Sequence, residues 1–290
     1  MGGAPLIKLD ELTKPATVLI EKISDAVGGI FKPYQIVRVA KAEAEADRVR
    51  ADSQIQITDL HRRAMHRFLV EEGRKQSNIE DITVRALPLL NPDSSPQNVR
   101  VDWITNFFDK SRIVSEGSMQ QLWARILAGE ANNPGGFSRR TVNLLSDLEK
   151  SDAELFTLVC RFGWTLQELF YPLVFEFKHE IFKRNGIIFY NLTQLDSLGL
   201  INFDSRGLFQ LADQPRSLSL NYFGTSVQLD FGKDDGNQLF LGAVVLTQAG
   251  RELAGVCDLR PVDGFLDYAI AHWESRKLAP KIVELATQPT

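Results

Sequence analysis

The residues best suited to chemistry lie in the middle of the chain, where two glycines precede a serine and two arginines. They are Gly135, Gly136, Ser138, Arg139 and Arg140. If Ser138 caps a helix, free backbone N–H groups, the helix dipole and two guanidinium groups converge on one point. The pattern predicts a binding site for an anion or a partner. The alternative is a plain helix cap whose arginines pair with Glu130 or Asp147.

The sequence carries no pattern typical of a metal centre, a nucleotide-phosphate loop or a serine nucleophile. His61 and His66 are five residues apart, so they point to different sides of a helix and make a poor metal pair. Cys160 and Cys257 lie among apolar neighbours, which favours buried, reduced thiols over a disulfide or a metal pair. We therefore expect no cofactor, no metal and no catalytic residue.

Composition limits the partners of the chain. Its 290 residues carry a formal net charge of -4, and the isoelectric point is about 5.7, so no global basic field attracts nucleic acid. No apolar run approaches the roughly 18 residues of a membrane span. We expect a cytoplasmic protein, at most peripheral to the inner membrane.

Residues 1–33 are expected to form an irregular tail followed by an amphipathic helix. Its apolar residues recur at spacings of three and four, which places them on one stripe: Leu19, Ile20, Ile23, Val27, Ile30 and Phe31. The opposite side mixes acids with bases, whereas helices bound to a membrane surface usually carry excess Lys and Arg there. The stripe predicts docking on the protein's own body or on a partner. Contact with a membrane surface through residues 16–31 is the alternative.

Residues 34–90 contain no proline before Pro88 and are rich in helix formers, which predicts one long helix that could serve as an oligomerisation stalk. A break at Gly73 is the alternative. Segment 35–90 carries ten basic and nine acidic side chains, as expected for a solvated helix with many ion pairs. Its basic cluster, Arg62, Arg63 and Arg67, is either part of this solvated face or a knot that contacts phosphate.

The rest of the chain predicts two further parts. A polar linker at 91–98 precedes a central helical domain at 99–185, in which aromatic residues such as Trp103 and Phe107 are expected to form the core. Residues 186–280 suggest a winged-helix-like module with an enlarged β wing, and 281–290 a tail. Within the module we expect strands at 187–190, 218–223 and 227–231, a helix at 191–199, a hairpin turn at Asp234–Gly236 and a helix capped by Thr247. The expected fold class is α+β, mainly helical.

Two stretches carry a resemblance to a known family. They are IEKISDAVGGIFKPYQIVRVAKAEAEA at 20–46 and DWITNFFDKSRIVSEGSMQQLWARILAGEANNPGGFSRRT at 102–141. LFTLVCRF and the DGFLDY run at 263–268 are also similar to it. The chain resembles bacterial proteins that share a domain of unknown function. The resemblance implies no activity, ligand or site residue, and its layout is similar to that of proteins linked with phage-defence loci.

These observations favour a non-catalytic interaction or scaffold protein that binds a protein partner or a second copy of itself, with a role in anti-phage defence. A winged-helix regulator that binds nucleic acid is the main competing function. Segment 186–256 speaks against such a regulator, because its four basic and seven acidic side chains repel phosphate. A peripheral membrane-associated effector and an enzyme with an unrecognised site are two further functions that the sequence leaves open.

Overall fold

The computed structural model describes residues 12–28 and 59–283 of the chain. The chain divides into two compact units, Met1–Ser146 (unit 1) and Asp147–Thr290 (unit 2). The division falls at Ser146, not at the linker 91–98 or after residue 185, where the sequence predicts boundaries. Helices and strands both occur, and all of the named strands lie in unit 2.

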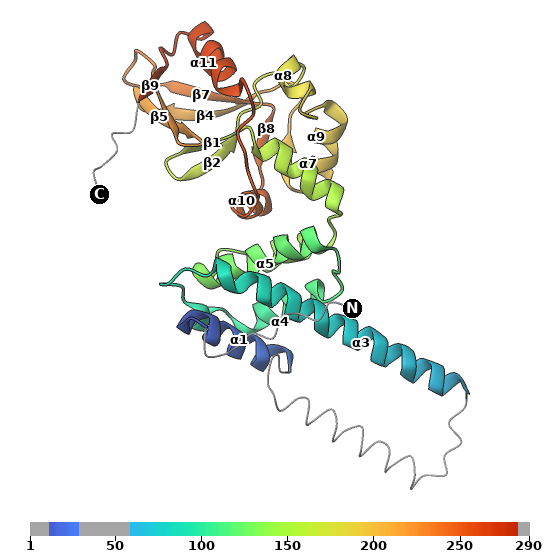
Figure 1. Cartoon of the computed structure of the whole chain (residues 1–290). Coiled ribbons are helices and arrows are strands. Elements are labelled where there is room, and N and C mark those ends of the chain that lie inside the picture. Colours follow the sequence, from blue (N-terminus) through green and yellow to red (C-terminus); the bar gives the residue numbers. More distant parts are fainter. Residues whose placement is uncertain (1–11, 29–58, 284–290) are drawn as a thin grey trace. The chain divides into compact units, whose positions relative to one another are not determined.

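Unit 1 is helical (Figure 1). Its described elements are α1 (Lys14–Val27), α3 (Asp59–Ala86), η2 (Leu87–Leu89), η3 (Pro96–Asn98), α4 (Val101–Ser111), α5 (Gly117–Asn132) and α6 (Arg139–Ser146). α3 packs along α5, and α4 contacts α1 and α6. The expected aromatic core is present: the Phe107 ring stacks on Trp103 at 5.1 Å and meets Trp123 edge-on at 5.1 Å.

α1 is defined at both ends by its own residues. The Thr13 side chain accepts a hydrogen bond from Ala16 N–H, and Gly28 ends the helix with a φ of 88°. Ile30 and Phe31, which the sequence places on the same stripe, lie outside the described residues. Lys22 donates from Nζ to the carbonyl of Val99 at 2.7 Å, which ties α1 to the segment before α4.

The predicted linker 91–98 is part of the packed unit. Ser95 N–H donates to Ala131 O at 3.0 Å, and Asn91 N–H donates to the Asn132 side chain at 2.9 Å. Pro96 is buried within η3. The polar composition of this segment therefore reflects a tight connection that is bonded to the end of α5, and the prediction of a domain boundary here is wrong.

α3 continues through Gly73 without a break. Residues 34–58, which the sequence assigns to the same helix, lie outside the described residues. A buried polar network anchors the C-terminal half of α3: Asn78 donates to Arg112 O at 2.8 Å and accepts from Gln120 at 3.2 Å. Because Asn78 and Gln120 are both buried, this network fixes how α3 lies against the α4–α5 connection.

Unit 2 is mixed helix and sheet. It begins with α7 (Lys150–Cys160), β1 (Gly163–Leu166), β2 (Leu169–Pro172), α8 (Glu180–Lys183), α9 (Phe189–Ser197), β3 (Ile201–Phe203) and β4 (Phe209–Gln214). It continues with β5 (Ser217–Tyr222), β6 (Thr225–Asp230), β7 (Asn237–Gly242), β8 (Val244–Leu246), α10 (Gln248–Ala254), α11 (Phe265–Ser275) and β9 (Lys281–Val283). The sheet orders are β2-β1-β5-β6-β9, β3-β8 and β4-β7, and every strand pair is antiparallel.

Two predictions about the strands of unit 2 are wrong. Residues 187–190 form no strand, because α9 already begins at Phe189. Asp234–Gly236 does not close a hairpin, since β6 pairs with β5 and β9 whereas β7 pairs with β4. A tight hairpin turn lies instead at Phe223-Gly224, which joins β5 to β6 with positive φ values of 45° and 88°.

Close backbone approach explains the LTQAG run at the start of α10. Thr247 caps the helix, as predicted, by accepting from Gly250 N–H at 3.0 Å. A Cβ atom on Gly250 would lie 2.0 Å from the carbonyl oxygen of Leu200, which precedes β3. Only glycine therefore lets α10 pack this closely on the β3 end of the β3–β8 pair.

The core of unit 2 is aromatic. Trp164 of β1 lies 4.9 Å from Trp273 of α11 and 5.0 Å from Tyr222 of β5. The Tyr222 hydroxyl donates to Arg161 O at 3.0 Å and accepts from Val262 N–H at 2.8 Å. α11 is thus held over the five-stranded sheet, whose edge strand β9 comes from residues that the sequence assigns to a tail.

Candidate functional sites

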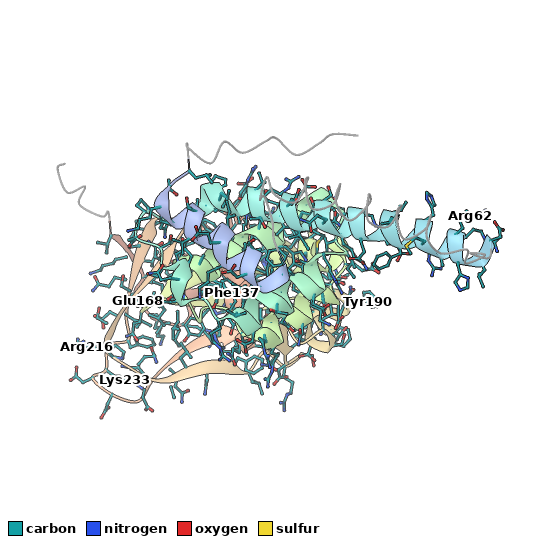
Figure 2. The ribbon with its side chains drawn as sticks, turned by 90° about the horizontal axis from the view of Figure 1, so that it is seen from below. Arg62, Phe137, Glu168, Tyr190, Arg216 and Lys233 are labelled. Carbon is teal, nitrogen blue, oxygen red and sulfur yellow. The ribbon has the colours of Figure 1, made fainter. Side chains whose placement is uncertain are left out.

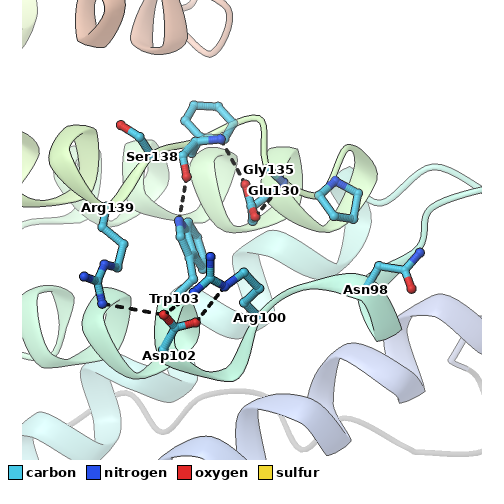
Figure 3. Close-up of a pocket in the computed structure, with 10 residues that line it drawn as sticks. Asn98, Arg100, Asp102, Trp103, Glu130, Gly135, Ser138 and Arg139 are labelled. Atoms are coloured by element: carbon cyan, nitrogen blue, oxygen red, sulfur yellow. Dashed lines mark hydrogen bonds and ion pairs between the residues drawn. The ribbon is translucent and has the colours of Figure 1, made fainter.

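The turn between α5 and α6 contains the glycine–arginine motif. Glu130, at the end of α5, is buried, and its two carboxylate oxygens accept from Gly135 N–H at 2.8 Å and from Phe137 N–H at 2.9 Å. Gly136 N–H donates to Asn133 O at 2.9 Å. Two backbone N–H groups of this turn are therefore bonded to a carboxylate of the protein itself, and a third is bonded to a backbone carbonyl (Figure 3).

The same turn is locked by two aromatic residues. Trp103 of α4 donates its indole N–H to Phe137 O at 2.7 Å. The Phe137 ring covers Gly129, where a Cβ atom would lie 2.7 Å from the ring. Gly129, Glu130 and Phe137 are thus packed and bonded to one another. The AGE and PGGF runs of the sequence therefore hold the α5–α6 turn in place.

The two arginines of the motif differ in their surroundings. Arg139 Nη1 lies 3.6 Å from Asp102, which also receives two hydrogen bonds from Arg100 at 3.0 and 2.7 Å. The hydrogen bond from Arg100, helped by the nearby charges of Arg100 and Arg139, lowers the pKa of the Asp102 carboxyl group. Arg140 is exposed. Arg139 pairs with Asp102, not with the two acids that the sequence suggests, Glu130 and Asp147.

Two arginines and two acids line a pocket of about 380 Å³, and their formal charges cancel: Arg100, Arg139, Asp102 and Glu130. Ser138 has its predicted role, because its hydroxyl oxygen accepts from Thr141 N–H at 3.2 Å at the start of α6. The arrangement orders the α5–α6 turn. With the N–H groups of Gly135 and Phe137 bonded and Arg139 neutralised, the geometry favours the helix-cap interpretation over the anion site.

The N-terminal half of α3 has the opposite character, because apolar side chains lie on its surface. Leu60 is 65% exposed and Phe68 57% exposed, whereas Ile82 further along the helix is fully buried. Met65, Leu69 and Val70 are also exposed. In Figure 2, Arg62 lies near the N-terminal end of α3, well apart from Phe137.

The basic cluster on α3 belongs to its solvated face. Arg62 and Arg63 both pair with Asp59, at 3.4 and 2.9 Å, and Arg67 lies 3.7 Å from Glu71. The arginines and Asp59 are largely exposed, and Glu71 is about half exposed. Such pairs contribute little to stability. They do offset part of the positive charge that a phosphate would need.

The apolar stripe of α1 lies inside unit 1. Leu19 and Ile23 are fully buried, Ile20 nearly so, and Val27 is half-buried. α1 contacts α4 and η3 through this side. The described part of the stripe therefore docks on the protein's own body, and these side chains are not available to a membrane or a partner in this structure.

Two searches of the described residues concern metal ligands and membrane-spanning helices. Within 12–28 and 59–283, no three His, Cys, Asp or Glu side chains gather where they could hold a metal ion. The helices of the same ranges include none with the length and apolar character needed to cross a bilayer. Cys160 and Cys257 form no disulfide, and Cys160 is buried.

Comparison with known proteins identifies the family. Residues 62–269 match the family described as "Protein of unknown function (DUF2806)", so the chain belongs to that family. The match includes most of α3, the α5–α6 turn and unit 2 as far as α11. No curated protein and no solved structure matches the chain significantly.

Proposed function

We propose that the protein is a non-catalytic interaction protein and that the exposed apolar residues of α3 form its contact surface. We define the α3 stripe as Leu60, Ala64, Met65 and Phe68. The observation that carries the proposal is that these residues continue, along one helix, the side that packs against α5. A side of this kind gains free energy when another surface covers it.

The geometry of α3 supports a helix as the binding partner. Positions spaced alternately by three and four residues run from Met65 and Phe68 through Glu72 and Lys75 to Ile79 and Ile82. Ile79 and Ile82 are buried, whereas Met65 and Phe68 are exposed. Such spacing is the repeat by which helices pack along one another. The Glu72–Lys75 ion pair, at 2.6 Å, lies on α3 between the exposed and the buried part of this series.

The biological setting we propose is defence against phage, in line with the layout that the resemblance implies. The test compares phage plating efficiency on the native host, on a strain that lacks the gene, and on strains that carry variants. We expect the deletion to lose protection and Phe68→Asp to behave like the deletion. Val70→Asp should behave like the wild type, because Val70 is exposed on the other side of the helix. Equal protection with and without the gene would contradict this setting.

A second candidate function is a nucleic-acid-binding regulator. We propose that α7, α8, α9 and the β3–β8 pair correspond to a winged helix with an enlarged wing. Phe189 and Tyr190 are exposed at the start of α9, as base-stacking residues would be (Figure 2). The acidic excess of segment 186–256 argues against this function. Fluorescence anisotropy with labelled single-stranded and duplex oligonucleotides at low salt tests it, and salt-sensitive binding would support it.

A further inference from the structure

We infer that Cys160 and Cys257 form a redox-sensitive modification site, in which oxidation by a peroxide joins the two sulfur atoms in a disulfide. Cys160 is the last residue of α7, and Cys257 lies in the turn that follows α10. The disulfide ties these two segments of unit 2 together. The inference goes beyond the proposed function and does not depend on the α3 stripe.

The two thiols are in contact, although they are far apart in the chain. Cys160 is fully buried, and Cys257 is half-buried. Their side chains share a hydrogen bond. Cys257 Sγ also donates to the carbonyl of Leu253 at 3.4 Å, so its single proton is directed away from Cys160. The proton of the shared hydrogen bond therefore belongs to Cys160, and the two sulfur atoms face each other.

Hydrogen bonds that do not involve sulfur hold the same two segments side by side. Arg161, the residue after Cys160, donates from Nε to Arg260 O at 3.1 Å and from Nη2 to Pro261 O at 3.3 Å. Both acceptors lie only three or four residues beyond Cys257 in the sequence. The position of the thiol pair is therefore set by contacts of the flanking residues as well as by the sulfur atoms.

Formation of the disulfide requires little movement of the backbone. The Tyr222 hydroxyl bridges the same segments, because it donates to Arg161 O at 3.0 Å and accepts from Val262 N–H at 2.8 Å. Tyr222 is itself buried. A disulfide has an S–S distance of about 2.05 Å, so two sulfur atoms already in hydrogen-bond contact reach it by a short approach of their side chains.

The two cysteines differ in how they meet an oxidant. Burial, followed by the hydrogen bond with Cys257, raises the pKa of the Cys160 thiol. The thiolate is the form of cysteine that attacks a peroxide, so Cys160 is protected from direct oxidation. Cys257 is partly exposed and is the sulfur that a peroxide reaches. Cys257 therefore reacts first and Cys160 resolves the product, as in redox sensors that hold a second cysteine beside the first.

The reaction balances with hydrogen peroxide as the oxidant. The thiolate sulfur of Cys257 attacks one peroxide oxygen, the O–O bond breaks, and the leaving hydroxide takes up the proton that the thiol released. The products of this step are a sulfenic acid and one water molecule. The Cys160 sulfur then attacks the Cys257 sulfur, the S–O bond breaks, and the leaving hydroxide takes the proton of the Cys160 thiol. The two thiols thus lose two electrons, which reduce the peroxide to two molecules of water.

The disulfide should stabilise unit 2. Residues 160 and 257 enclose the segment from β1 to α10, which includes every described strand except β9. Closing so long a loop restrains the unfolded chain and so favours the folded one. We therefore expect the midpoint of urea denaturation to be higher for the oxidised chain than for the reduced chain, and dithiothreitol to reverse the difference.

Peptide mapping of the full chain before and after treatment with hydrogen peroxide tests the inference. Trypsin places the two cysteines of the chain in separate peptides, because Arg161 and Arg251 lie between them. We expect an intact mass lower by two hydrogen atoms, one disulfide-linked peptide pair and a raised urea midpoint. Two thiols that both remain open to alkylation, a disulfide between separate chains, or an oxidised chain that unfolds at lower urea would overturn the inference.

Single variants test the roles of the two sulfur atoms. In Cys160→Ala, the sulfenic acid of Cys257 has no resolving thiol and should accumulate as an adduct with dimedone. In Cys257→Ala, the matched change at the other position, Cys160 should be oxidised at least tenfold more slowly than Cys257 is in the wild type, because Cys160 is buried. Equal rates at the two positions would overturn the assigned roles. The peptide map of the wild type remains decisive if alanine at the buried position 160 prevents folding.

Discussion

The α5–α6 turn and the N-terminal half of α3 belong to the same unit, but they differ in which side chains they bury and which they expose. In the turn, charged and polar groups point inward: Glu130 is buried and bonded to two backbone N–H groups. On α3, apolar groups such as Leu60 and Phe68 point outward. The turn contains the most chemically suggestive motif of the sequence, yet its polar groups are bonded to one another. The difference teaches that reactive residue types do not identify the functional surface here.

The largest expected effect concerns Glu130. Glu130→Ala leaves the N–H groups of Gly135 and Phe137 buried without their acceptor, so we expect the free energy of unfolding of unit 1 to fall by about 3 kcal/mol. Urea denaturation with hydrogen exchange of the α5–α6 amides measures this loss.

The matched control for Glu130 is Glu116→Ala, on the same helix. Glu116 also accepts from a backbone N–H, that of Met119, at 2.7 Å, but it is an exposed N-cap. Its removal should cost about 1 kcal/mol. If both variants lose the same small amount, the buried carboxylate does not lock the turn.

A medium effect extends the comparison to a second inward-pointing polar group, His272 of unit 2. Its ring stacks on Phe175 at 3.9 Å, and burial, with a smaller contribution from the charge of Arg276, lowers its pKa to about 4. The unfolded chain takes up the proton near pH 6.5. Stability should therefore be full above about pH 6.5 and fall as the pH drops toward 4, by an amount on the order of 1 kcal/mol given its partial exposure.

Chemical denaturation of the wild type and of His272→Gln at pH 7, 5.5 and 4.5 measures this contribution. Glutamine does not titrate in this range, so the pH dependence of the variant should be shallower than that of the wild type. Parallel pH profiles would show that the His272 imidazole is not held neutral by its surroundings.

The smallest effect is expected for the arginines that the sequence singles out. Arg139→Ala/Arg140→Ala removes one exposed ion pair and should change the free energy of unfolding by less than about 0.5 kcal/mol. Added phosphate should not raise the midpoint of thermal unfolding, either of the wild type or of the double variant. A phosphate-dependent rise in the wild type that the double variant loses would restore the anion site.

Local sequence patterns predicted much of the fold. The Ser138 and Thr247 caps are confirmed, as are strands close to 218–223 and 227–231. The β1–β2 hairpin was missed because its turn, Gln167-Glu168, adopts positive φ values of 48° and 68° without a glycine or asparagine to indicate them.

The remaining errors involve contacts between residues far apart in the chain. The pairing of β7 with β4 instead of β6 is a tertiary choice that the Asp234–Gly236 run cannot reveal. The partner of Arg139 is Asp102, 37 residues earlier, so spacing within the motif could not identify it. The exposure of the apolar residues in the N-terminal half of α3 could not be predicted for the same reason. Periodicity identifies an apolar stripe on a helix, but it does not show which part of the stripe α5 covers.

One measurement tests the central claim most directly: phage plating efficiency on strains that carry Phe68→Asp or Arg139→Ala/Arg140→Ala, beside the wild type. The account predicts that Phe68→Asp loses protection like the deletion, while the double-arginine variant protects like the wild type. Protection that survives Phe68→Asp but is lost in the double-arginine variant would contradict the account and would point to the α5–α6 turn as the functional surface.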